Sequence, residues 1–127
     1  MRRVPVLLSS CLLPLFAAAA PAGIPPSVME RETCRQHVAE MPRVGPADLP
    51  RVPGEYESYV VIDYRLDGSG RAVDARVVEA QPRKRAFGTA ALALLARIAF
   101  APGAVEEHCT HVRTFSKVRR GSVESPM

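Results

Sequence analysis

The chain has 127 residues, which is enough for one domain but not for two. Charged residues make up 24% of the sequence and apolar residues 47%, so ordinary globular behaviour is expected. With no Trp and only 6% aromatic residues, the core must be mainly aliphatic. The formal net charge of +4 and the pI near 9.3 indicate attraction to anionic surfaces or acidic partners, with no specific indication of nucleic-acid binding.

Residues 1–22 have the features of a secretory signal peptide. Two arginines precede an apolar run over residues 4–20, and the Ala-Pro-Ala sequence at 20–22 is a cleavage site that would leave Gly23 as the first mature residue. The apolar run is short and contains two prolines, which argues against a permanent membrane span. Two alternatives stay open, a lipoprotein cut before Cys11 and an uncleaved anchor. The favoured interpretation predicts a periplasmic protein.

Residues 23–54 are expected to form an N-terminal helix followed by a proline-rich linker. A Ser-x-x-Glu capping box at residues 27–30 predicts a helix that runs from Val28 to about Met41, where a proline follows. Residues 42–54 contain four prolines and two glycines, which is typical of an extended linker.

A β-hairpin is predicted next. Residues 59–66 are rich in β-branched and aromatic residues, with apolar side chains at every second position. Asp67-Gly68-Ser69-Gly70 supplies glycines for a turn, and residues 71–79 alternate again as the return strand.

The remaining elements are a helix and a third strand. Residues 86–99 are rich in Ala and Leu and place apolar side chains on one helical face. The sequence Phe-Ala-Pro-Gly at residues 100–103 ends this helix, and residues 111–118 alternate as a strand. A disordered tail is expected at residues 121–127.

The order helix, strand, strand, helix, strand predicts an α+β fold. We expect a three-stranded antiparallel sheet packed against one main helix, with an additional N-terminal helix. A sheet this small leaves an edge that is open to pairing with another strand.

Cys34 and Cys109 are the only cysteines of the mature chain, and two cysteines in an exported protein favour one disulfide. His37, His108 and His111 lie near them, so a zinc site is an alternative if the two regions converge. The spacing matches no established zinc motif. We therefore expect the disulfide, and no metal or other cofactor.

Several short motifs follow one another in a characteristic order. The hairpin reads V-x-I-x-Y, then D-G, then G-R-x-V-x-x-x-V-V over residues 60–78, and Ala80-Gln81-Pro82 follows. A Phe-led, Ala-rich helix then ends in aromatic-x-P-G at residues 100–103. Together these motifs resemble the C-terminal domain of the TonB energy-transducer family over residues 55–120.

This resemblance implies a non-catalytic module that engages an outer-membrane TonB-dependent receptor, or another periplasmic protein. In the family, a short extended receptor segment is added to the sheet beside the last strand, so that backbone hydrogen bonds supply affinity. Carried over to this sequence, the docking edge comprises six residues of the last strand, Val112, Arg113, Thr114, Phe115, Ser116 and Lys117. The alternative is a plain edge strand that its two basic residues protect against aggregation.

The sequence departs from the family at several positions. Residues 42–54 are too short to cross the periplasm, Glu55-Tyr56-Glu57 replaces the usual Tyr-Pro pair, and Ile98 replaces a late aromatic residue. These departures favour an alternative function, a soluble accessory or envelope protein that uses the fold without energy transduction. Membrane contact is expected only if the N-terminus is retained or lipidated.

An enzyme is the competing class of function. Four carboxylates, Asp63, Asp67, Asp74 and Glu79, lie at outward or turn positions of the predicted hairpin. No Ser, His and Asp set has a recognisable catalytic context. We therefore expect no catalytic residues.

Overall fold

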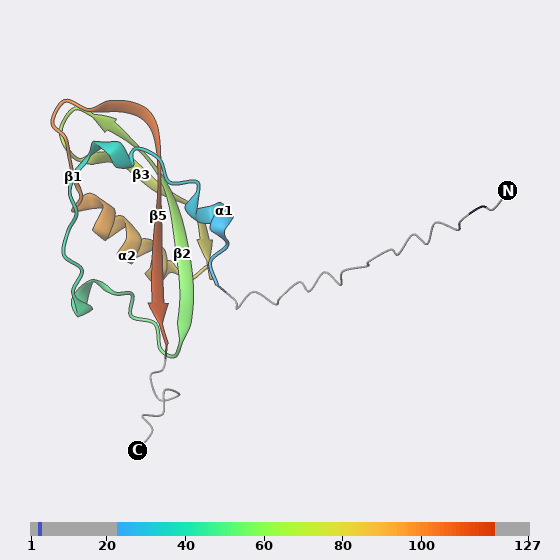
Figure 1. The fold of residues 1–127 in the computed structure, drawn as a ribbon. Helices are drawn as coiled ribbons and strands as arrows, with labels where there is room; N and C mark the ends of the chain where they lie inside the picture. The colour runs from blue at the N-terminus through green and yellow to red at the C-terminus, as the bar shows by residue number, and fades with distance from the viewer. Residues whose placement is uncertain (1–2, 4–22, 119–127) are drawn as a thin grey trace, which may run out of the picture.

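The computed structural model describes Arg3 and residues 23–118 of the chain (Figure 1). The predicted signal peptide, the lipidation alternative at Cys11 and the predicted disordered tail therefore lie outside the described residues. Within the described residues, no helix is long and apolar enough to cross a membrane.

A three-stranded antiparallel sheet in the order β3–β2–β5 forms the centre of the fold (Figure 1). It consists of β2 (Tyr56–Asp67), β3 (Ala72–Gln81) and β5 (Val105–Lys117). The predicted α+β class and three-stranded sheet are confirmed, and β2 and β5 are longer than their period-two patterns indicated. The central strand β2 carries apolar side chains on both faces, and Val60, Val61 and Ile62 are all fully buried.

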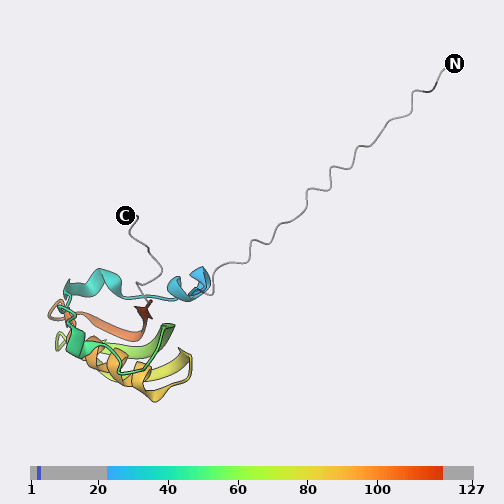
Figure 2. The ribbon, with the colours of Figure 1, turned by 90° about the horizontal axis from the view of Figure 1, so that it is seen from below.

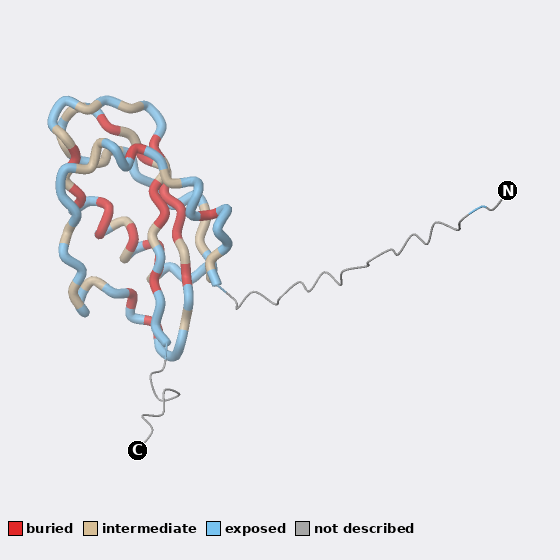
Figure 3. The backbone as a smooth tube through the Cα atoms, in the orientation of Figure 1, coloured by how far each residue is buried: buried red, intermediate tan, exposed pale blue. Residues whose placement is uncertain are grey.

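The main core lies between one face of the sheet and α2 (Arg85–Ala96). Phe87, Leu94 and Leu95 of this helix are buried in one cluster with Val60 and Ile62 of β2. Buried residues follow β2 and the inner side of α2 (Figure 3). The helix ends earlier than predicted, since Ala99–Phe100 form the short strand β4.

The N-terminal helix is much shorter than predicted. Helix α1 covers only Pro26–Met29, and no side chain caps its start, so the Ser-x-x-Glu capping box does not form. A 3-10 turn, η1 (Arg35–His37), and the strand β1 (Val38–Glu40) follow, and β1 pairs with β4. Tertiary contacts outweigh the local helix signal, because Val28 is buried against the second face of the sheet with Val61 and Val112.

The proline-rich stretch that was expected to be an extended linker packs on the domain. It contains a second 3-10 turn, η2 (Pro46–Asp48), and Val52 is buried in the main core. Asp48 Oδ1 pairs with Arg97 Nη1 at 2.8 Å. A hydrogen bond from the Gly45 N–H, followed by one from Arg97, lowers the pKa of Asp48. Figure 2 shows the N-terminal segment beside β5 and α2 on the other side of the sheet.

Candidate functional site: the outer edge of β5

All six residues predicted to bind a partner lie on β5, which is an edge strand of the sheet. Their side chains alternate between the two faces, so Phe115 faces the main core while Val112 faces the second, smaller cluster. Thr114, Ser116 and Lys117 are exposed, and Arg113 is half-buried. The pairing of β5 with β2 runs without a shift from Tyr56–Lys117 to Tyr64–Cys109. This stretch of β5 is therefore a regular strand edge.

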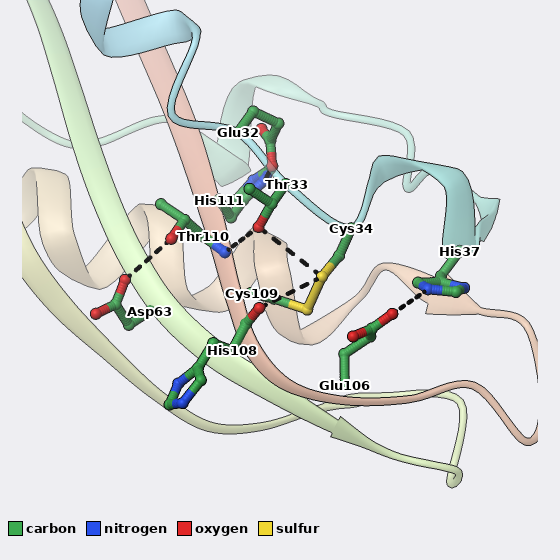
Figure 4. Close-up of a disulfide and its surroundings, with 10 residues drawn as sticks. All are labelled: Glu32, Thr33, Cys34, His37, Asp63, Glu106, His108, Cys109, Thr110 and His111. Carbon is green, nitrogen blue, oxygen red and sulfur yellow. Dashed lines mark hydrogen bonds and ion pairs between the residues drawn. A yellow bond between two sulfur atoms is a disulfide. The ribbon is translucent and has the colours of Figure 1, made fainter.

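Residues of the N-terminal segment occupy the part of this edge around Thr110 and Val112, called the upper half below. The lower half is the part around Thr114 and Ser116. The Thr33 N–H donates to the Thr110 carbonyl at 2.8 Å, and the Thr110 N–H donates to Thr33 Oγ1 at 2.8 Å. The Val112 N–H donates to Glu32 Oε1 at 3.1 Å. Figure 4 shows Thr33 beside Thr110, next to the disulfide. Thr33 thus pairs with both outward backbone groups of Thr110, one through its own N–H and the other through its hydroxyl oxygen.

The same contacts establish which backbone groups of β5 point away from the sheet. In an antiparallel pair, alternate residues direct both N–H and C=O outward. Because Thr110 and Val112 do so, the next outward residues are Thr114 and Ser116. Within the described part of the chain, the N–H groups of Thr114 and Ser116 have no hydrogen-bond partner. The lower half of the edge therefore offers free donors.

The expected disulfide between Cys34 and Cys109 is confirmed. Both residues are buried, at 5% and 2% exposure, and they are 75 residues apart in the sequence. On the chain-entropy model a loop of that length corresponds to about 4 kcal/mol of stabilisation. The bond joins the N-terminal segment to β5 at the position next to Thr110.

The histidines considered as zinc ligands point to different partners. His37 Nε2 lies 2.9 Å from Glu106 Oε1, and His111 Nδ1 lies 3.1 Å from Glu32 Oε2 (Figure 4). Among residues 23–118, no group of three or more His, Cys, Asp or Glu side chains is placed to hold a metal ion. The cysteines of the zinc alternative are bonded to each other instead.

A polar cluster lies behind the upper half of the edge. The side chains of His111 and Glu32 are only 9% and 13% exposed, and His111 Nε2 is buried with no partner in the described chain. Burial, and then the charge of Glu32, raise the pKa of Tyr64 to about 12. Burial lowers the pKa of Arg113, and the charge of Glu32 partly opposes this shift. Two guanidinium nitrogens of Arg113 have no hydrogen-bond partner among the described residues.

The lower end of β5 is fixed to the body of the protein. Lys117 Nζ donates to the Val52 carbonyl at 3.2 Å and lies 5.9 Å from the centre of the Tyr56 ring. The ring of Phe115 lies 6.4 Å from that of Phe87 on α2. These contacts hold the open stretch in an extended conformation before any partner arrives.

The four carboxylates considered for catalysis all have partners, three of them within the sheet or its turns and one in the N-terminal segment. Asp63 accepts a hydrogen bond from the Thr110 hydroxyl at 3.2 Å, and Glu79 pairs with Arg31 at 3.2 Å. Asp74 pairs with Arg65. Hydrogen bonds from Ser69 lower the pKa of Asp67, which is the ordinary behaviour of a turn carboxylate.

Glu32 and Thr33 are the site residues that sequence reasoning missed. Both lie inside the helix that the sequence predicts over residues 28–41, whereas in the structure they bind the edge of β5. The only signal in the sequence was the neighbouring Cys34, because a disulfide to Cys109 brings the residues on either side of it close to β5. Comparison of the chain with protein-family models, with curated proteins and with solved structures finds no match.

Proposed function

We propose that the protein is a non-catalytic periplasmic binding module that captures an extended segment of a partner protein on the outer edge of β5. The partner expected from the sequence is an outer-membrane TonB-dependent receptor, engaged as the TonB C-terminal domain engages its receptors. In this proposal the sheet, with α2 on one face and the N-terminal segment beside β5, is the docking scaffold.

One observation carries the proposal. The outward N–H groups of Thr114 and Ser116 continue a row whose first two members, Thr110 and Val112, already bind residues of another segment. In the upper half these donors are taken by side-chain oxygens of Thr33 and Glu32, and in the lower half the same donors have no partner among the described residues. Backbone donors in an extended, fixed strand are what strand addition requires.

The opposite edge of the sheet is a poorer template. The pairing of β3 with β2 shifts register twice, and Asp74 has a φ of 53°. Such irregularities bend a strand and oppose pairing with a second chain. The register of β5 with β2 is continuous from Lys117 to Cys109 and shifts only beyond Tyr64, which supports this stretch of β5 as the docking strand.

A second candidate function is a soluble accessory or envelope protein without energy transduction. The packing of residues 42–54 on the domain favours it, because Val52 is buried and Asp48 pairs with Arg97. A segment held in this way does not act as an extended spacer. This candidate keeps the same docking edge and differs only in the absence of coupling to an inner-membrane motor.

The test is binding of synthetic peptides copied from the periplasm-facing segments of outer-membrane receptors, measured by fluorescence anisotropy. Thr114→Pro removes an outward donor without removing a bond to β2, and we expect it to weaken binding at least about tenfold. Thr114→Val is the matched control, because it removes the hydroxyl and keeps the backbone N–H. Equal binding by the Pro and Val variants, or no binding by any receptor segment, would exclude the proposed function.

A further inference from the structure

The end of the N-terminal segment binds the outer edge of β5, the same strand edge that is proposed to bind a partner. Residues 23–34, called the strap below, pack on the second face of the sheet through Val28, and their last residues bind the outer edge of β5 (Figure 4). The strap covers Thr110 and Val112 and stops before Thr114. It thus occupies the upper half of the edge proposed to bind a partner.

Several non-covalent contacts hold the strap. Its end is held by the Thr33–Thr110 and Glu32–Val112 hydrogen bonds. Glu32 also pairs with His111 at 3.1 Å, and Arg31 pairs with Glu79 at 3.2 Å. Near its start, Val28 is buried in a small cluster with Val61 and Val112. The strongest single attachment is covalent, the Cys34–Cys109 disulfide.

The fit of the strap end to the body is incomplete. A pocket of about 280 Å³ lies between Glu32 and Thr33 on one side and Tyr64, Phe100 and His111 on the other. His111 Nε2, in the wall of this pocket, is buried without a partner, which is unfavourable for the covered state. Cys34 itself has a φ of 63°, in the left-handed region that non-glycine residues avoid.

The chain after the strap is attached independently. The Ala101 N–H donates to the His37 carbonyl at 2.7 Å, and Val38 of β1 pairs with Phe100 of β4. If the disulfide opens, these contacts keep residues 37–40 in place. Cys34 then becomes the point from which the strap can swing away.

We propose that the strap is a built-in occupant of the docking edge, and that the Cys34–Cys109 bond sets how much of this edge a partner can use. The inference rests on the proposed function. With the bond intact, a partner strand reaches the outward groups of Thr114 and Ser116 only. After reduction the strap leaves the edge, and the outward groups of Thr110 and Val112 also become available to the partner strand.

The redox step is thiol–disulfide exchange with a dithiol, such as the active site of a periplasmic dithiol protein. A thiolate of the dithiol attacks one sulfur and breaks the Cys34–Cys109 bond, forming a mixed disulfide. The second thiol of the dithiol then displaces it. The dithiol is oxidised to a disulfide and loses two electrons and two protons, and Cys34 and Cys109 accept them as two thiols. Because both sulfurs are buried, exchange requires the strap to open locally first.

Amide hydrogen exchange tests the strap without any partner. In the disulfide-bonded protein we expect slow exchange at Thr110 and Val112 and fast exchange at Thr114 and Ser116. Reduction with dithiothreitol, or the double change Cys34→Ser and Cys109→Ser, should speed exchange at Thr110 and Val112 at least about tenfold. His111 and Arg113, whose N–H groups face β2, should stay slow and serve as internal controls.

Two results of this experiment would overturn the inference. Unchanged exchange at Thr110 and Val112 means that the strap stays without the bond. Fast exchange at His111 and Arg113 as well means that the bond holds all of β5. Thr33→Val, with the disulfide intact, provides a second test, because it removes the acceptor of the Thr110 N–H. We expect faster exchange at Thr110, and no change there would exclude Thr33 as the occupant.

Peptide binding to the reduced and disulfide-bonded proteins distinguishes failure of this inference from failure of the proposed function. The receptor peptides should bind the reduced protein about tenfold more tightly than the disulfide-bonded protein, because the number of outward donors doubles. Equal affinity in the two states, with strap release seen by exchange, overturns control by the strap and leaves peptide capture standing. Strap release without peptide binding in either state means that the proposed function, and with it the docking role of the strap, is wrong.

Discussion

The two halves of the β5 edge have the same backbone geometry and different surroundings. At Thr110 and Val112 the outward groups are paired with Thr33 and Glu32, and a disulfide next to them holds the covering segment. At Thr114 and Ser116 the same groups have no partner in the described chain. The difference arises from what covers the strand, since the register with β2 is continuous through both halves. An exposed strand edge favours pairing with another chain, and this protein covers one half of it with its own segment.

The largest effect is expected from proline substitutions that distinguish inward from outward residues in the open half. Phe115→Pro removes a bond to β2 and a buried aromatic ring, so it should cost about 5 kcal/mol of unfolding free energy. Thr114→Pro removes only an outward donor and should cost about 1 kcal/mol. Urea unfolding measures both.

These two variants check the assignment of outward residues directly. If Thr114→Pro proves as damaging as Phe115→Pro, then Thr114 is not outward. The alternation of inward and outward backbone groups would then differ between the two halves of the edge, and the proposed function depends on its being the same in both.

The covered half is held near the start of the strap by one buried side chain. Val28→Ala removes apolar volume from the cluster with Val61 and Val112 and should cost about 1.5 kcal/mol. Met29→Ala is the matched control, since Met29 is the next residue of α1 and is 41% exposed. It should change the free energy of unfolding by less than about 0.5 kcal/mol. Equal effects in urea unfolding would mean that α1 does not anchor the strap.

Local patterns were sufficient to predict the hairpin. Residues 59–66 alternate, and the turn that follows has glycines at the positive φ positions Gly68 and Gly70. The disulfide was predictable for a different reason, because the predicted export signal and the count of cysteines left one pairing. In both cases the information lies in short stretches or in composition.

The covering of the edge was not predictable in this way. The Ser-x-x-Glu sequence at residues 27–30 is a valid helix signal, but its helix would have kept Glu32 and Thr33 away from β5. Their actual partners lie 77 to 80 residues further along the chain. No periodicity within the N-terminal segment encodes such contacts. The choice of Thr114 over Phe115 for a proline test likewise required the register with β2.

The smallest effect, and the one that reports most directly on the covered half, concerns Tyr64. Its pKa of about 12 reflects burial first and the charge of Glu32 second, and Glu32 belongs to the strap. A raised pKa in the folded protein means that the neutral phenol is favoured. The resulting stabilisation is full below the ordinary tyrosine pKa near 10 and is lost as the pH rises toward 12.

Release of the strap removes the charge of Glu32 and leaves Tyr64 packed against Phe100 in the main core, so we expect the pKa of Tyr64 to fall in the Cys34→Ser, Cys109→Ser protein. A ¹³C chemical-shift titration of the tyrosine rings up to about pH 11 distinguishes the two states. In the disulfide-bonded protein Tyr64 should remain mostly protonated at the end of the titration, and in the variant a larger fraction of it should be ionised. Tyr56, which lies at the other end of β2, is the internal control. Identical curves for Tyr64 in both proteins would mean that the strap still covers this half of the edge, which would then be closed for reasons other than the disulfide.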